Sequence, residues 1–269
     1  MSPISSWLVE APAGGFLANA VEVQWDPASV KLSHAATDRM KTVWNDCLRQ
    51  AEAEGRTLFD GAITRLIEAR LDHSGTTPTV VLRVGPGSYQ AFVVTRLQDR
   101  SWFETHAPEA VTLALGNSVL LTNGSRVLLG VRGRNVSAYA GRLHQFGGVV
   151  EALNTREFPA NVEGLIAHLL VELREELNLD PRDLAPRYPL PHLAPAWPRL
   201  LGIFYDHALG QPELIWQWET NVPLSHIAQQ IDKAEHDGHV ILERSDVESK
   251  APENLTPLAR EAIAAWSRQ

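Results

Sequence analysis

Residues 162–179 predict an amphipathic helix, and this segment constrains the fold more than any other part of the chain. Asn161 is a good residue to cap its start, and apolar residues recur at helical spacing along one side. This stripe, the face that a helix of this kind buries, consists of Ile166, Leu169, Leu170, Leu173 and Leu177.

Three glutamates lie beside the apolar stripe, near the end of the same helix. Glu172, Glu175 and Glu176 are spaced i, i+3 and i+4, so their side chains leave one face about 5–6 Å apart. Like charges at this spacing cost a few tenths of a kcal/mol per pair, and acidic groups in the last turns oppose the negative end of the helix. Two interpretations are open: a site for a hard cation such as Mg²⁺, or a solvated acidic face.

The composition is that of a soluble globular protein. The chain has 269 residues, 44% hydrophobic and 21% charged, which suffices for one large domain or two small ones. Its net charge of −8 argues against nucleic acid or an anionic membrane as the main partner. The first residues lack the basic region of a signal peptide and no stretch is apolar enough to span a bilayer, so we expect a cytoplasmic location.

The first 110 residues predict a small α+β unit. Residues 36–54 have helical periodicity, with the only cysteine, Cys47, on the apolar side, where we interpret it as a core residue. Strands are predicted at residues 64–71 and 79–84. A break in the second strand is predicted at residues 85–89, and a polar loop at residues 98–110. We place a domain boundary near residue 110.

A β-hairpin opens the second unit. Strand-like residues flank Asn123-Gly124, and Asn-Gly is the strongest short hairpin signal because both residues tolerate positive φ. The pair Gly147-Gly148 follows, and the helix with the glutamates comes next. Further strands are predicted at residues 200–205, 214–220 and 240–242. A final helix is predicted from Thr256-Pro257 onward.

The order of these features resembles the sequence box of the Nudix hydrolases. In that family a glycine, an acid a few residues later and a helix reading Arg-Glu-Leu-x-Glu-Glu-x-Gly-Leu follow a hairpin. The matching positions here are Gly148 and residues 171–179. Val171 takes the place of the usual arginine, Asn154 takes the place of the early acid, and the segment between Gly148 and Glu172 is nine residues longer.

One branch of the family, the UDP-glucose/UDP-galactose hydrolases, shares the stretched box and the missing arginine. Elements similar to its N-terminal domain are Trp44, Leu58-Phe59-Asp60, Arg65-Leu66 and Ser88-Tyr89-Gln90-Ala91-Phe92. The resemblance covers nearly the whole chain and implies an α/β fold. Residues 111–269 would form a Nudix α/β/α sandwich with a mixed sheet, and residues 1–110 a small α+β cap domain that recognises the substrate.

The resemblance implies hydrolysis of the diphosphate bond of a nucleotide sugar such as UDP-glucose, giving UMP and a sugar 1-phosphate. Mg²⁺, or alternatively Mn²⁺, would neutralise phosphate oxygens and lower the pKa of a bound water. The implied catalytic residues are Glu172, Glu175 and Glu176, with Glu175 binding a second ion or activating water. The same three glutamates, the Gly147 carbonyl and Glu235 are the implied metal ligands.

Five residues are candidates for substrate contacts. Arg142 either holds a phosphate through its guanidinium or forms a surface ion pair. In the N-terminal unit, Asp60, Arg65, Ser88 and Tyr89 either reach the nucleoside or sugar or serve folding alone. A tyrosine ring such as that of Tyr89 is suited to stack on uracil.

Several residues keep a second interpretation. Glu235 is either a ligand or a loop carboxylate, and we interpret His144 and His168 as structural. His236 and His239 have metal-like spacing, but no third soft ligand accompanies them, so zinc is not expected.

Two other functions remain open. An enzyme of the same fold would cleave another nucleoside diphosphate derivative such as ADP-ribose, and a catalytically silent module would only bind nucleotides, as Val171 and the insertion suggest. Isopentenyl diphosphate isomerase chemistry fits poorly, because it requires a cysteine in the Nudix domain and Cys47 lies outside it.

Overall fold

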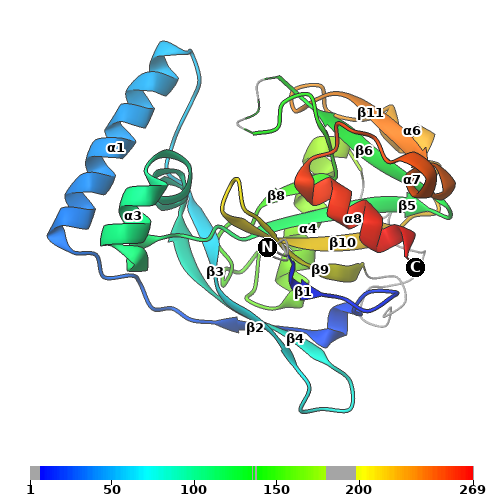
Figure 1. Cartoon of the computed structure of the whole chain (residues 1–269), viewed down its shortest axis with the longest axis horizontal. Coiled ribbons are helices and arrows are strands. Elements are labelled where there is room, and N and C mark those ends of the chain that lie inside the picture. The colour runs from blue at the N-terminus through cyan, green and yellow to red at the C-terminus, as the bar shows by residue number, and fades with distance from the viewer. Residues whose placement is uncertain (1–6, 135, 137, 180–197, 269) are drawn as a thin grey trace.

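Two β-sheets organise the chain, and helices cover both faces of the larger one (Figure 1). The computed structural model describes residues 7–134, 136, 138–179 and 198–268. The larger sheet has the strand order β1-β9-β10-β5-β6-β11, with β7 paired to β6 and β8 paired to β5. Its strands are β1 (Trp7–Glu10), β5 (Gly116–Asn123), β6 (Arg126–Arg132), β7 (Leu143–His144), β8 (Phe146–Val149), β9 (Arg199–Asp206), β10 (Gln211–Glu219) and β11 (His236–Glu243). The sheet is mixed, since β10 pairs with β5 in parallel and its other pairings are antiparallel.

Helix α4 (Val162–Leu177) packs on one face of this sheet. Its stripe, including Leu169 and Leu173, is buried in one cluster with Trp216 of β10. The helix begins where predicted, because the Asn161 side chain accepts a hydrogen bond from the amide of the third residue after it. Burial of the stripe therefore fixes which face of α4 remains for the glutamates.

Asn117 of β5 connects α4 to the sheet beside the glycine pair. Its buried carboxamide donates to the Leu165 carbonyl (2.8 Å) and accepts from the indole Nε1 of Trp216 (2.7 Å). In the antiparallel register of β5 and β8, Asn117 lies opposite Gly148. The first turn of α4 is thus tied to β5, at the position that pairs with Gly148 of β8.

Helix α8 (Pro257–Ser267) covers the opposite face. Its Ile263 and Trp266 are buried in a second cluster with Ile215 of β10, and the Thr256 side chain caps its start as predicted. The α/β/α sandwich with a mixed sheet is therefore confirmed. Two shorter helices, α6 (Leu224–Ala228) and α7 (Arg244–Lys250), contact β11.

The smaller sheet has the order β2-β4-β3 and carries its own helices. The main elements are β2 (Val21–Trp25), β3 (Ala62–Asp72), β4 (Thr79–Ser88), α1 (His34–Ala53), α2 (Tyr89–Phe92), the π-helical η2 (Val93–Gln98) and α3 (Arg100–His106), with short 3-10 turns at η1 (Ala18–Ala20) and η3 (Pro108–Ala110). Met40 and Trp44 of α1 share a buried cluster with Phe103 of α3, and the half-buried Cys47 packs against it. The α+β character of this unit is confirmed.

Two local predictions are wrong. Residues 98–110, expected as a polar loop, contain α3, because the fully buried Phe103 anchors that turn from within a polar sequence. Residues 85–88, expected to break the second strand, continue β4. There Gly85 admits close packing, since a Cβ would lie 2.5 Å from the Asp26 carbonyl oxygen.

The two N-terminal strands, β1 and β2, were not predicted from the sequence. β2 pairs with β4 in parallel, whereas β1 joins the larger sheet through β9. The chain therefore contributes to the larger sheet before it forms the smaller one. The boundary at residue 110 stays a prediction.

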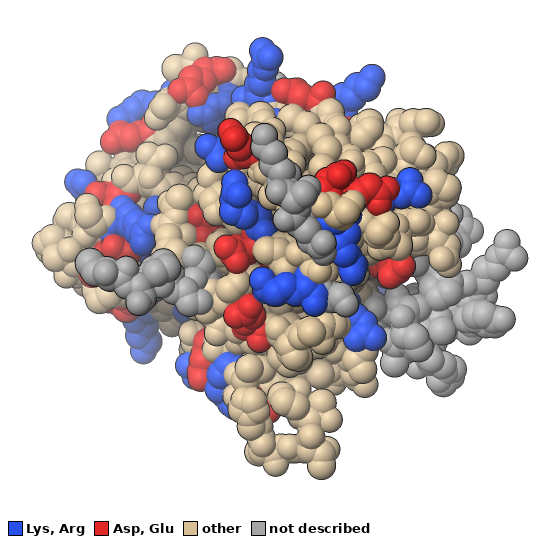
Figure 2. Space-filling model, turned by 45° about the vertical axis from the view of Figure 1, so that its right-hand side comes forward, with Lys and Arg blue, Asp and Glu red and all other residues tan. Residues whose placement is uncertain are grey.

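The surface carries charges of both signs. On the face drawn in Figure 2, Lys and Arg side chains lie among Asp and Glu side chains. Within the described ranges, no helix combines the length and apolar character needed to cross a bilayer.

Candidate functional site

Gly147 and Gly148 lie within strand β8, and the acidic side chains lie against this glycine pair. Gly147 has a φ of 136°, a conformation that favours glycine, and a Cβ there would collide with the Asn117 carbonyl oxygen. A Cβ on Gly148 would lie 2.8 Å from both carboxylate oxygens of Glu172. Position 147 excludes a side chain, and the Glu172 carboxylate rests directly on the Gly148 backbone.

Glu176 reaches the same glycine pair from one helical turn further along α4. Its Oε1 accepts a hydrogen bond from the Gly147 amide (3.2 Å), and its Oε2 lies 3.3 Å from Nε2 of His236. The Glu176 side chain is 6% exposed and the Glu172 side chain 20% exposed. These two members of the glutamate triplet therefore point inward and converge on the glycine pair of β8.

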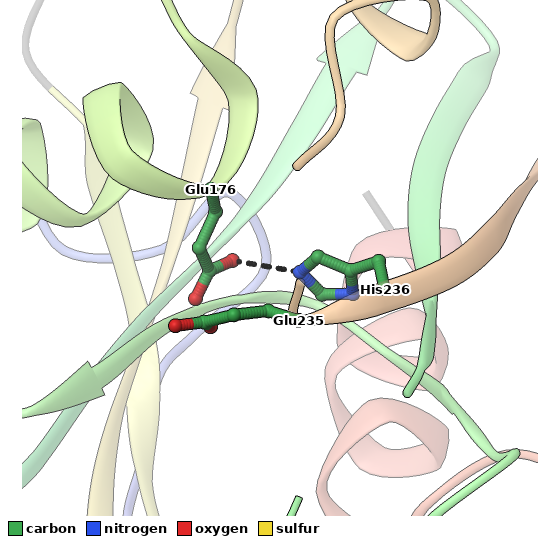
Figure 3. Close-up of side chains that lie close together, drawn as sticks. All are labelled: Glu176, Glu235 and His236. Atoms are coloured by element: carbon green, nitrogen blue, oxygen red, sulfur yellow. Dashed lines mark hydrogen bonds and ion pairs between the residues drawn. The ribbon is translucent and has the colours of Figure 1, made fainter. Parts of the chain in front are cut away.

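Glu235 joins this group from the residue before β11 (Figure 3). Glu176, Glu235 and His236 each offer one possible ligand atom, and these atoms lie within 4.8 Å of one another. Glu235 is exposed, whereas His236 is buried with its ring edge-on to Phe146. Two elements distant in sequence thus bring carboxylates to one point.

Burial raises the pKa of both inner carboxyls. The pKa of Glu172 is raised to about 8, first by burial and then by the negative charges of neighbouring glutamates, Glu176 foremost. Burial also raises the pKa of Glu176, against the opposing effect of the hydrogen bond with His236. Among the described residues neither carboxyl forms an ion pair with Lys or Arg. A divalent cation would supply the missing positive charge and reverse both shifts.

Glu175, the third member of the triplet, lies apart from the other two. It is exposed, yet close enough for its charge to raise the pKa of Glu172. The triplet is therefore divided into two enclosed carboxyls and one at the solvent edge.

Val171 occupies the position that matches the arginine of the Nudix sequence box. Val171 packs against the main hydrophobic cluster rather than facing the glutamates. His168 takes a place beside Glu172, with its Nε2 3.4 Å from Oε1 of that residue. Burial lowers the pKa of His168 to about 4, so this imidazole is uncharged at neutral pH.

The insertion before α4 is anchored on the N-terminal unit. The hydroxyl of Thr64 in β3 donates to the Glu151 carbonyl (2.6 Å) and accepts from the Leu153 amide (3.0 Å). Phe158, also in the insertion, is buried with its ring edge-on to His168 (5.6 Å). The extra residues therefore connect the glutamate helix to the smaller sheet.

A cleft of about 700 Å³ lies between the N-terminal unit and the larger sheet. Tyr89 and Phe92 line it from the N-terminal side, and Arg132 lines it from the core. Gly147 and Gly148 line it as well, so this glycine pair is shared by the cleft and by the acidic cluster.

Only Tyr89 among the five predicted substrate residues lines this cleft. Burial raises the pKa of its hydroxyl. Asp60 and Ser88 accept hydrogen bonds from backbone amides of α2, whereas Arg65 and Arg142 donate to backbone carbonyls. These four have structural partners, and their substrate roles stay predictions.

The polar residues that line the cleft and were not predicted from the sequence include Arg132, Tyr139, Asp206, Gln211 and Glu213. They come from β6, β9, β10 and the loop after β6, so no sequence spacing connects them. The Tyr139 hydroxyl donates to Asp206 (2.7 Å), and burial together with this bond raises the pKa of Tyr139. His144 also lines the cleft, but its Nδ1 is 2.8 Å from the Thr256 hydroxyl, consistent with a structural role.

Among the known proteins compared with this chain, only solved structures show a similarity to it. No family model matches the chain, and no curated protein matches it. A MutT Nudix hydrolase from Burkholderia pseudomallei superposes with a TM-score of 0.37 at 18% identity, over 56% of this chain and 96% of that one. A MutT protein from Methanosarcina mazei Go1 gives a TM-score of 0.38 at 13% identity, over 58% and 94%. A Nudix hydrolase from Nitrosomonas europaea gives 0.35 at 14%, over 57% and 88%. Similarities at this level do not assign an activity.

Proposed function

We propose that this chain is a metal-dependent hydrolase of the Nudix type that cleaves the diphosphate bond of a nucleoside diphosphate derivative. One observation carries the proposal. Glu172 and Glu176 form no ion pair with Lys or Arg among the described residues, and they contact the glycine pair that also lines a substrate-sized cleft. Buried carboxyls in this state are suited to a cation.

The residues present fit a hard divalent cation. Glu172, Glu176 and Glu235 would hold Mg²⁺ or Mn²⁺ through carboxylate oxygens, with the Gly147 carbonyl as a further candidate. Such an ion supplies neutralisation of phosphate oxygens and a more acidic bound water. The Gly147 amide and His236 orient Glu176, and the solvent-edge position of Glu175 suits it to accept a proton from water or to bind a second ion.

We propose a nucleotide sugar such as UDP-glucose as the substrate, with UMP and a sugar 1-phosphate as products. The support is the resemblance to the UDP-sugar branch and the N-terminal wall of the cleft, where Tyr89 offers an aromatic ring to a base. The cleft volume of about 700 Å³ lies within the range of small-molecule pockets.

The test is hydrolysis of UDP-glucose by the purified protein with Mg²⁺, with ADP-ribose assayed in parallel. We expect release of UMP and glucose 1-phosphate, reduced at least a hundredfold in Glu172→Gln and in Glu176→Gln. Glu163→Gln is the matched control, because Glu163 lies in the first turn of the same helix. Full activity in both site variants would reject the site. Binding without turnover under any divalent ion would instead support the silent module, and preference for ADP-ribose would redirect the substrate assignment.

A further inference from the structure

Gln211 and Glu213 form a polar pair on the β10 side of the cleft. Residues two apart on a strand project from the same face, and both side chains lie over Gly116 of the neighbouring β5. A Cβ on Gly116 would collide with the Glu213 carboxyl and lie 2.9 Å from Nε2 of Gln211. Both residues line the cleft although each is only 9% exposed. The absent side chain at position 116 leaves the space that this pair fills.

The hydrogen-bonding capacity of the pair is largely unused. The Gln211 carboxamide makes no hydrogen bond to any residue in the described ranges, and Glu213 forms no ion pair with Lys or Arg there. The Ser118 hydroxyl is the hydrogen-bonding neighbour of the Glu213 carboxyl, and Ser118 also accepts from Gln145 (3.0 Å). Because the Gln211 carboxamide opens onto the cleft and has no protein partner among the described residues, it is available to bond a ligand there.

The chemistry of the pair favours an uncharged hydroxyl over a phosphate. A carboxamide both donates and accepts, and burial raises the pKa of Glu213 to about 8, so its carboxyl also donates and accepts at neutral pH. Nearby Asp206 is already engaged, accepting from Tyr139 and from two backbone amides. The neutral pair itself offers no positive charge to a phosphate, whereas a hydroxyl can donate to and accept from both of its members.

We infer that Gln211 and Glu213 form a subsite for the hydroxyl groups of the uncharged, sugar-like part of the substrate. This inference rests on the proposed function, because the charged part of the substrate is assigned to the glutamate cluster. It divides the cleft between two parts of the substrate. The residues of β10 select the group attached to the diphosphate, and the glutamate cluster holds the charged part.

The experiment compares ligands with and without that group. Binding of UDP-glucose against UDP, and of ADP-ribose against ADP, is measured by calorimetry with Ca²⁺ as the divalent ion. We expect Gln211→Leu and Glu213→Leu to weaken binding of the sugar-bearing ligand at least tenfold and of its sugar-free counterpart less than threefold. Gln211→Asn, which retracts the carboxamide by one methylene, provides a milder variant should leucine disturb folding, and thermal melts monitor the fold.

Gln217→Leu is the matched control, because Gln217 projects from the same side of β10 but lies outside the cleft lining. It should change neither affinity. Equal losses for both ligands of a pair would assign Gln211 and Glu213 to the base or phosphates, and no loss would make the pair structural; either result overturns the inference. Hydrolysis that is lost in Glu172→Gln but unaffected by the β10 variants would overturn this inference alone. Failure of the wild type to bind or hydrolyse any of these ligands would remove the proposed function as well.

Discussion

His236 and Glu176 meet in the interior of the site, with Nε2 of the imidazole 3.3 Å from Oε2 of the carboxylate and neither side chain more than 6% exposed. The other carboxylate oxygen of Glu176 accepts from the Gly147 amide. Both oxygens are therefore oriented by the protein itself. Partners of this kind fix the direction in which a ligand presents its lone pairs to a metal.

Removal of the imidazole donor should weaken metal binding. We expect His236→Phe, which keeps a ring in the same space, to lower Mn²⁺ affinity about tenfold or more, because outer partners of metal ligands typically contribute 10–100-fold. His236→Gln, which retains a side-chain N–H, should recover part of that loss. The measurement is Mn²⁺ titration followed by electron paramagnetic resonance. Equal affinity in all three proteins would mean that Glu176 does not depend on His236.

Gly130 offers an independent way to displace the same ring. A Cβ at this position of β6 would lie 2.5 Å from Nδ1 of His236, so Gly130→Ala should push the imidazole away from Glu176 and lower Mn²⁺ affinity in the same direction. Gly238→Ala is the control, since a Cβ there would make only ordinary contact, 3.8 Å from Val131. A loss of affinity in the control as large as that in Gly130→Ala would contradict this explanation.

The metal-free protein should become less stable as pH rises. The pKa of Glu172 is about 8 in the folded protein against an ordinary value of 4.5, so the folded state binds the proton more tightly. Its stabilising contribution is full below about pH 4.5 and is lost as pH rises through about 8. In chelator, Glu172→Gln should therefore be more stable than wild type at pH 9, by at least about 1 kcal/mol, since one pKa unit corresponds to about 1.4 kcal/mol.

Urea unfolding at pH 5, 7 and 9 measures this difference. Glu163→Gln should follow the wild type at every pH, because Glu163 is exposed. A Glu172→Gln variant that loses stability with pH as steeply as the wild type would show that Glu172 is not enclosed as described.

The insertion should depend on Thr64 for its attachment to the smaller sheet. Thr64→Val keeps the shape but leaves the Glu151 carbonyl and the Leu153 amide without their partner, which should destabilise the protein by roughly 1–3 kcal/mol. Thr105→Val is the comparison, because the Thr105 hydroxyl bonds to a carbonyl at an exposed position of α3. If denaturant midpoints fell equally in both variants, the anchoring role of Thr64 would be wrong.

The predictable parts of the fold are those with local signals. The Asn123-Gly124 hairpin and the capped helices α4 and α8 each depend on residues close together in sequence, and each is confirmed. The inward direction of Glu172 and Glu176 follows from α4, because once its stripe is buried the adjacent positions face the end of the sheet. Local periodicity therefore predicted α4 and its buried stripe, and the cation site formed by its glutamates stays a prediction.

The remaining features depend on tertiary contacts. α3 forms around one buried aromatic residue in a polar segment. β1 is a strand only because it pairs with β9, which is distant in the sequence. His236 is 60 positions from Glu176, and Gln211 becomes a cleft residue only because Gly116 on a neighbouring strand leaves space for it. No spacing within a single segment encodes such partners.

Mn²⁺ titration of the wild type, Glu172→Gln, Glu176→Gln and the exposed control Glu163→Gln tests most directly whether the enclosed carboxyls form a cation site. The predicted result is saturable binding by the wild type and the control, weakened at least a hundredfold in each of the two site variants, with affinity that rises between pH 6 and pH 9 as the Glu172 carboxyl, whose pKa is about 8, loses its proton. Equal affinity in all four proteins, or no saturable binding by the wild type at pH 9, would contradict the central claim.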